Sequence, residues 1–272
     1  MIMMLPALEE HDPGNGRGEL EKMANEIILD LDPSFDFFRP EDRAGTAVRA
    51  SLDRRASVKD LVESCGIPHT EIGYLGMDGK EVGFSHIPRS PGRLTVRGIS
   101  PPFDVERPSF LRPEPLSALR FIADANVIRL GRLMLILGFD VELCRRGSDG
   151  DIARQAQTQG RIVLTRDTAL LKRKKIIFAR RVRADLPYDQ VFEVVHFFGL
   201  EQRTAFFSRC TACNALLEPR AKDEILHLLE PKTRLYFHRF FQCPECGRIF
   251  WRGSHVENMR EKFSALGISI NG

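Results

Sequence analysis

The chain has 272 residues, enough for about two domains, and its 43% hydrophobic and 28% charged residues are typical of a globular protein. No stretch approaches the roughly 18 apolar residues of a membrane-spanning helix, which excludes that class of membrane protein. The net charge of +3 divides unevenly, because residues 1–114 hold 14 Lys and Arg against 20 Asp and Glu, whereas residues 115–272 hold 26 against 17. The basic second half is typical either of nucleic-acid binding or of a surface kept soluble by Lys and Arg.

The first 22 residues are polar and contain glycine, which predicts a disordered tail. They lack the basic start and the small-residue cleavage site of a signal peptide. We therefore expect a cytoplasmic protein, and in that compartment disulfides are rare.

Residues 23–104 are expected to form a small α+β domain. The sequence NEIILDLD alternates like a strand, and ASVKDLVESCGI predicts a short helix in which Ser57 and Asp60 form a capping box. Asp78-Gly79 is the favoured two-residue turn of a hairpin, and GRLTVRGI closes as a strand. Two strands, a helix, a hairpin and a last strand are the element order of a β-grasp domain.

Seven prolines between residues 86 and 117 interrupt any regular structure. We expect a linker at residues 105–117, with the domain boundary inside it.

From residue 118 the predicted strands and helices alternate, and this order indicates a parallel sheet with right-handed crossovers. The successive segments are RFIAD, NVIRLGRLMLILG, FDVELC, SDGDIARQAQTQG, RIVLTRD, TALLKRKK, KIIFARRV and PYDQVFEVVHFFGL.

Acidic residues follow these predicted strands, and ligands of open parallel sheets bind at the carboxyl ends of strands. Asp124 and Asp167 come just past two strands, Asp149 and Asp151 open the helix after a third, and Asp185 follows the fourth. Clustered carboxylates repel one another unless a cation joins them, and oxygen ligands favour Mg²⁺ or Mn²⁺. The pattern predicts a metal site that activates water for phosphoryl displacement, as in a nuclease.

Some of these acids have structural alternatives. Asp151 stands three residues after Ser148, a spacing that also fits a purely structural capping box, and Asp149 is also placed to favour the helix dipole. The alternative for Asp185 is a turn residue before Pro187. Asp124 and Asp167 are harder to explain in this way. A carboxylate directly after a buried strand costs desolvation energy, which favours a functional role for these two acids.

Two neutral polar residues adjoin the predicted site. Asn126 is either a partner of the acids or the N-cap of the next helix, and Thr165 either bonds a carboxylate or simply fits a strand end. Basic residues around this edge are expected to hold RNA phosphates, although charge runs are also common on solvated faces. They are Arg129, Arg132, Arg166, Lys172, Arg173, Lys174 and Lys175.

Two Cys-x-x-Cys pairs, Cys210 with Cys213 and Cys243 with Cys246, are separated by 29 residues. Paired motifs of this kind indicate four-thiolate zinc, because a redox motif needs one pair and a disulfide needs an oxidising compartment. Four thiolates leave no open position, so this zinc is expected to be structural.

The segments FIADANVIRLGRLMLILGFD, DGDIARQAQTQGRIVLTRDTALLKR and RCTACNALLEP…FQCPECGRIFWRGSH together resemble the Mut-seven C-terminal RNase family over residues 119–262. Members combine a PIN-like nuclease domain with a zinc ribbon, and SVKDLVESCGIPHTEIGYLGMDGKEVGF resembles the ubiquitin-like domain that precedes it. The resemblance implies metal-dependent RNA cleavage, acidic-site roles for Asp124, Asp149, Asp151 and Asp167, and zinc ligation by the four cysteines. Unlike sulfur carriers, the β-grasp segment has no free Gly-Gly end, so docking or RNA positioning is expected of it.

The sequence thus predicts an α+β and α/β protein with six parts: a tail (1–22), a β-grasp domain (23–104), a linker (105–117), a PIN-like domain (118–205), a zinc ribbon (206–262) and a tail (263–272). The predicted function is a Mg²⁺- or Mn²⁺-dependent ribonuclease with structural zinc and RNA as its partner. The alternative is a non-catalytic RNA- or ribosome-binding module, or an adaptor whose β-grasp domain recruits a protein.

Overall fold

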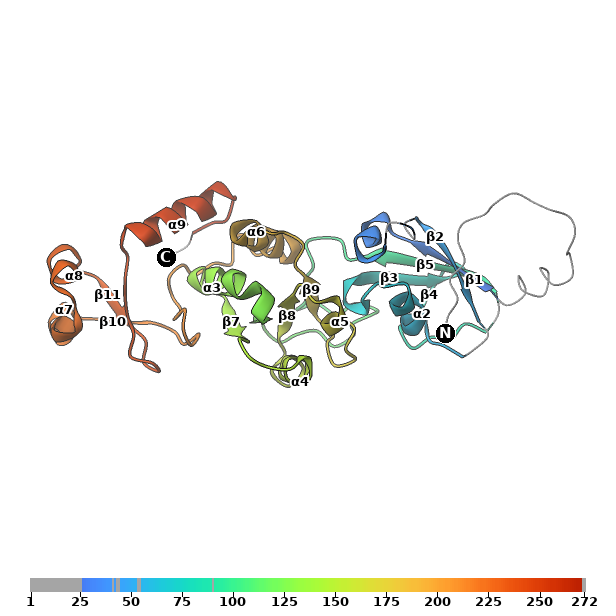
Figure 1. Cartoon of the computed structure of the whole chain (residues 1–272), viewed down its shortest axis with the longest axis horizontal. Helices are drawn as coiled ribbons and strands as arrows, with labels where there is room; N and C mark the ends of the chain where they lie inside the picture. Colours follow the sequence, from blue (N-terminus) through green and yellow to red (C-terminus); the bar gives the residue numbers. More distant parts are fainter. Residues whose placement is uncertain (1–25, 41, 43–44, 53–54, 90, 271–272) are drawn as a thin grey trace, which may run out of the picture. The chain divides into compact units, whose positions relative to one another are not determined.

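The computed structural model describes residues 26–270, apart from residues 41, 43, 44, 53, 54 and 90 (Figure 1). The predicted disordered tail lies outside the described residues. The chain forms two compact units. The first unit runs to Ser100 and also contains Pro108–Pro115 and Asp167–Ile177, and the second contains Pro101–Arg107, Leu116–Arg166 and the chain from Phe178 onward.

The first unit is built on a five-stranded sheet with the order β2-β1-β5-β3-β4. Its strands are β1 (Glu26–Leu31), β2 (Ala47–Ser51), β3 (Ile72–Met77), β4 (Lys80–Glu81) and β5 (Gly92–Gly98). The central pair, β1 with β5, is parallel, and the remaining pairs are antiparallel. This arrangement confirms the predicted β-grasp topology.

Local signals in the sequence account for the helix and hairpin of this sheet. Helix α2 (Val58–Ser64) begins at Ser57, where both bonds of the predicted capping box with Asp60 are present. The hairpin turns at Asp78 and Gly79, whose φ angles of 48° and 81° are those of a two-residue turn with left-handed central residues. Two short 3₁₀ helices, η1 (Pro33–Phe38) and η3 (His69–Glu71), complete the domain.

The proline-rich segment contributes a buried guanidinium to the first unit. Arg112 is 3% exposed and donates hydrogen bonds to the carbonyl oxygens of Ile72 (2.9 Å), Thr70 (3.0 Å) and Ile177 (3.2 Å). Burial lowers the pKa of Arg112 to about 10, so the group stays charged at neutral pH. Although the prolines predict a linker, Pro108–Pro115 therefore packs as part of the first unit.

Two further side chains bind the segment Asp167–Ile177 to the β-grasp domain. The buried ring of His69 lies with Nε2 2.8 Å from the Ile176 carbonyl oxygen and Nδ1 2.7 Å from Oε1 of Glu63. Lys172 Nζ donates to the Glu63 carbonyl oxygen at 2.9 Å. These contacts explain why the segment belongs to the first unit.

The second unit contains a four-stranded sheet that is parallel, as predicted, and its strand order is β7-β6-β8-β9. Its strands are β6 (Arg120–Ala123), β7 (Asp140–Leu143), β8 (Ile162–Thr165) and β9 (Ala179–Arg181). Its helices are η4 (Ala125–Val127), α3 (Ile128–Ile136), α4 (Asp149–Gln159) and α6 (Pro187–Phe198). Figure 1 shows α3 and α6 beside each other and α4 on the opposite side of the strands. The central strands β6 and β8 are almost completely buried, which fits their continuous apolar sequences.

The C-terminal part of the second unit, residues 206–262, is called the ribbon below. Its three-stranded antiparallel sheet has the order β10-β11-β12, formed by β10 (Glu218–Arg220), β11 (Phe240–Gln242) and β12 (Ile249–Trp251). The helices here are α7 (Lys222–Ile225), η5 (Leu226–Leu228), α8 (Pro231–Tyr236) and α9 (Ser254–Ala265). A small core of Ile225, Leu229 and Phe240, with Phe237, Ile249 and Trp251 packed against it, joins the α7–α8 region to β11 and β12.

The residues predicted as a C-terminal tail begin inside α9 and pack against the second unit. Phe263 and Ile268 are buried, and the backbone N–H of Ser269 donates to the Glu201 carbonyl oxygen at 2.9 Å. Across the described part of the chain, no helix has both the length and the apolar character needed to cross a membrane.

Candidate functional site

Three donors fix the carboxylate of Asp124 where β6 ends. Oδ1 accepts the backbone N–H of Ala125 at 2.6 Å. Oδ2 accepts a hydrogen bond from Asn126 Nδ2 at 2.6 Å and another from Thr165 Oγ1 at 2.7 Å. The parallel pairing of β6 with β8 places Thr165, the last residue of β8, within reach of the acid. The carboxylate is thus oriented by two strands that are far apart in sequence.

Asn126 joins the same two strand ends through its amide group. Nδ2 contacts both Asp124 and Thr165, the latter at 3.2 Å, and Oδ1 accepts the backbone N–H of Arg166 at 3.0 Å. The cap of η4 is Asp124, so the structure supports the interpretation of Asn126 as a partner of the acid. Thr165, which is fully buried, likewise bonds the carboxylate in addition to fitting the strand end.

Asp151 has the structural role that its spacing allowed. Its Oδ2 accepts hydrogen bonds from the backbone N–H and the hydroxyl of Ser148, and the Ser148 hydroxyl accepts the Asp151 N–H in return. The hydrogen bonds from Ser148 lower the pKa of Asp151, and Arg154 pairs with its other oxygen. Asp149, half-buried, is the first residue of α4.

Asp167 caps the short helix α5 (Thr168–Leu171) by accepting the Ala169 N–H on Oδ1 at 2.7 Å. It follows Arg166 directly and begins the segment that belongs to the first unit. Asp185 is exposed and forms a 2.7 Å ion pair with the Arg166 guanidinium. The convergence of the acids in one metal site remains a prediction.

The predicted phosphate-binding residues differ in their surroundings. Arg166 pairs with Asp185, and Lys172 donates to a backbone oxygen of the β-grasp domain. The other five are exposed: Arg129, Arg132, Arg173, Lys174 and Lys175. Arg180, in contrast, is structural, because it pairs with Glu193 at 2.9 Å while Glu193 also accepts two backbone N–H groups after β9.

The four cysteines form a preorganised ligand set. Their Sγ atoms all lie within 4.8 Å of one another, with Cys210 and Cys246 3.6 Å apart and Cys213 and Cys243 3.3 Å apart. Tetrahedral zinc with bonds of about 2.3 Å requires sulfur atoms about 3.8 Å apart. Among the residues that the structure describes, this is the one group of three or more His, Cys, Asp or Glu side chains so arranged. The donor set and spacing fit the predicted structural zinc.

Both Cys-x-x-Cys turns have the backbone geometry of a metal knuckle. Asn214 and Gly247, each one residue after the second cysteine of its pair, adopt left-handed φ angles of 67° and 71°. Their N–H groups donate to the carbonyl oxygens of Cys210 and Cys243, at 2.9 and 3.0 Å. The Ala212 N–H lies 3.4 Å from Cys210 Sγ, so a backbone donor faces a ligand sulfur.

Asp140, which is half-buried, forms a link between the first knuckle and the parallel sheet that sequence reasoning missed. Asn214 donates to Asp140 Oδ1 at 2.8 Å and accepts the Val141 N–H at 3.2 Å, and Arg161 pairs with the same carboxylate oxygen at 2.6 Å. Burial raises the pKa of Asp140, but the hydrogen bonds from Arg161 and Asn214 outweigh this and lower it. The available signal was Asn214 itself, because asparagine tolerates the left-handed turn that ends a knuckle.

Comparison with known protein families gives two matches. The model described as Mut7-C ubiquitin matches residues 26–104, and the model described as Mut7-C RNAse domain matches residues 119–263. The second match spans just over half of the chain and contains both the parallel sheet and the ribbon. Searches of curated proteins and of solved structures found no match.

Proposed function

The chain belongs to the Mut7-C RNase domain family, with a Mut7-C ubiquitin domain before the RNase domain, and on this premise we propose that it is a metal-dependent ribonuclease. Its active site lies at the carboxyl ends of β6 and β8, where RNA phosphodiester bonds are hydrolysed. The observation that carries the proposal is the Asp124 carboxylate, oriented by Asn126 and Thr165 across two strands. A strand end with an acid fixed in this way is where parallel sheets bind ligands.

The donor set fits a hard divalent cation. Asp124, Asp149 and Asp167 offer only oxygen, which Mg²⁺ and Mn²⁺ prefer. A carboxylate has about four acceptor sites, and the three hydrogen bonds to Asp124 occupy one site on Oδ1 and two on Oδ2. These described hydrogen bonds allow Oδ1 to accept a cation as well. Bound there, Mg²⁺ or Mn²⁺ supplies charge neutralisation and activates water.

The chain's own residues orient the acids and hold the substrate. Asn126 and Thr165 prevent rotation of the Asp124 carboxylate, and Asn126 also fixes the backbone of Arg166, next to Asp167. The exposed basic residues of the second unit, including Arg129 and Arg132, attract RNA phosphates. Asp151 supports the start of α4 through its capping box, and Asp185 orients Arg166.

The β-grasp domain has an internal role in this proposal. Through His69, Arg112 and Lys172 it holds the segment that begins with Asp167. The same segment carries the basic run Arg173, Lys174 and Lys175. Recruitment of a separate protein by the exposed sheet edges is a further proposed role.

The ribbon is proposed to hold one structural zinc and to assist RNA binding. Four cysteines complete a tetrahedral shell, so zinc there stabilises the fold and leaves no position for substrate. Zinc ligation requires thiolates that are not in disulfides, so the proposed location is the reducing cytoplasm.

The test of the proposal is cleavage of labelled RNA by Asp124→Asn and Asp167→Asn variants. Losing one metal-ligating acid costs several kcal/mol of transition-state stabilisation, about a hundredfold or more in rate. Wild-type rates in both variants would contradict the site.

A second candidate function is a non-catalytic RNA- or ribosome-binding module. The observation that favours it is that Asp124, Asp151 and Asp167 all accept backbone N–H groups at helix starts, a structural use of each acid. Metal-independent RNA binding without cleavage would distinguish this function from the first.

A further inference from the structure

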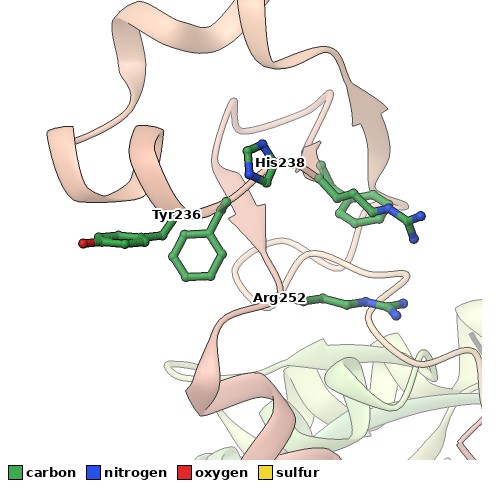
Figure 2. Close-up of a pocket in the computed structure, with 6 residues that line it drawn as sticks. Tyr236, His238 and Arg252 are labelled. Carbon is green, nitrogen blue, oxygen red and sulfur yellow. The ribbon is translucent and has the colours of Figure 1, made fainter.

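A pocket of about 360 Å³ opens on the ribbon, among elements other than those that carry the acids (Figure 2). It is formed by the end of α8, the connection to β11, β11 itself and the residue after β12. The lining residues are Tyr236, Phe237, His238, Arg239, Phe241 and Arg252. Aromatic rings, guanidinium groups and an imidazole therefore meet in one surface hollow.

Two phenylalanine rings of the pocket are fixed by the ribbon. The ring of Phe237 packs against Trp251 with centroids 6.1 Å apart, and that of Phe241 lies edge-on to Phe207 at 6.0 Å. Tyr236, in contrast, is 69% exposed although it adjoins these rings. Tyr236 is therefore exposed beside two rings that are fixed by packing. An exposed aromatic ring in this position provides a stacking surface for a planar ligand.

The charge of the pocket selects an anion. Two of its six lining residues are arginines, one is histidine, and none is acidic. The Arg252 guanidinium lies 5.9 Å from the ring centroids of both Phe206 and Phe207, so aromatic contacts hold it in place. Arg239 is exposed at the rim. In Figure 2, Tyr236 and Arg252 extend in opposite directions with His238 between them in the view.

We propose that this pocket binds a short stretch of single-stranded RNA, with one base against Tyr236 and phosphates of the same strand on Arg239 and Arg252. Single-stranded RNA offers planar bases that stack and a phosphate at every backbone position, which suits a pocket with an exposed aromatic ring and two guanidinium groups. A paired base in a duplex is unable to enter, so the pocket selects unpaired RNA. The inference rests on the proposed function in that the polymer is RNA, but the binding step requires no cleavage.

The test measures binding of a 12-nucleotide fluorescent oligouridylate by anisotropy, with the full-length Asp124→Asn protein so that the RNA stays intact. Tyr236→Ala removes the stacking ring, and Tyr236→Phe retains it. Arg239→Gln removes a pocket charge, and Arg248→Gln removes an equal charge from an exposed position of the ribbon outside the pocket. Zinc content and circular dichroism of each variant check the fold.

Tyr236→Ala is expected to weaken binding about tenfold, while Tyr236→Phe stays within about twofold of the parent. Arg239→Gln is expected to make the dependence of log K on log salt shallower by about 0.7, the contribution of one phosphate contact on a single strand. Arg248→Gln leaves the slope near that of the parent, and a 12-base-pair RNA duplex binds equally to all variants.

Any one of three results would overturn the inference. The first is equal RNA affinity of Tyr236→Ala and Tyr236→Phe, and the second is an equal salt dependence of Arg239→Gln and Arg248→Gln. The third is absence of RNA binding by the parent. Cleavage by the chain with native Asp124, measured in parallel, separates this inference from the proposed function. If cleavage depends on metal but the pocket variants bind RNA as the parent does, the proposed nuclease activity stands and the proposed RNA-binding pocket is contradicted. If binding depends on the pocket but no RNA is cleaved, the pocket stands and the nuclease activity is contradicted.

Discussion

The Thr165 hydroxyl, at the end of β8, donates a 2.7 Å hydrogen bond to Oδ2 of Asp124, at the end of the neighbouring strand β6. The two residues are 41 positions apart in sequence. Parallel pairing brings them together because both strands end at the same edge of the sheet. The bond fixes the acid on which the proposed chemistry depends, and it can be removed without removing the acid.

Replacing Thr165 by valine keeps the shape of the buried side chain and deletes the hydroxyl. A hydrogen bond to a charged group contributes about 1.5–3 kcal/mol, so we expect kcat to fall about ten- to a hundredfold. Thr165→Ser, which keeps the hydroxyl, should retain most of the activity. Single-turnover RNA cleavage and Tm are the measurements, and equal activity of the Val and Ser variants would remove Thr165 from the account.

Asp151 is expected to affect stability more than chemistry, because its oxygens serve the capping box with Ser148. Its folded pKa is lowered, so its contribution is fully present above the unfolded value near 3.8 and is lost as pH falls below that value. The Tm difference between wild type and Asp151→Asn should therefore shrink below about pH 3.8. A cleavage rate reduced as much as in Asp124→Asn would instead make Asp151 a metal ligand.

The buried Arg112 is expected to be essential for the first unit. Substitution by methionine leaves the carbonyl oxygens of Ile72, Thr70 and Ile177 without their donor. We expect a loss of roughly 3 kcal/mol or more in the free energy of unfolding, together with faster amide hydrogen exchange in residues 167–177. Arg107→Met is the matched control, because that arginine side chain is 84% exposed. Equal stability of the two variants would show that the contacts of Arg112 contribute little.

Zinc is expected at one ion per chain, with no direct part in catalysis. Cys213→Ser should lose the ion and unfold the ribbon, whereas Asp124→Asn should retain it, since the cysteines and the acid use separate elements. Native mass spectrometry and circular dichroism measure both effects. Retention of a folded ribbon in a zinc-free Cys213→Ser protein would contradict the structural role.

Local chemistry made most of the second unit predictable from sequence. Apolar strands that alternate with helices predicted the parallel sheet, and the capping box of Ser148 and Asp151 marked the start of α4. The two knuckles were visible because four cysteines at short, repeated spacing have few alternative uses. Each of these signals lies within a few residues of the structure that it predicts.

Long-range polar contacts were not predictable in this way. Prolines indicated a linker around Arg112, although its guanidinium finds buried carbonyl oxygens 40 and 65 residues away in the chain. Asn214 and Asp140 meet across 74 residues, and the knuckle accounts for the turn at Asn214 but not for its distant partner. Such contacts depend on how finished elements pack, which short-range periodicity does not encode.

Cleavage of a labelled mixed RNA pool by the purified chain tests the central claim most directly. The reactions contain Mn²⁺, Mg²⁺ or EDTA, with the Asp124→Asn/Asp167→Asn double variant alongside and its zinc content measured. We predict cleavage with Mn²⁺ or Mg²⁺ by the wild type, and loss of cleavage with EDTA and in a double variant that still holds one zinc. RNA binding without cleavage under every condition, or cleavage unaffected by the double substitution, would contradict the account.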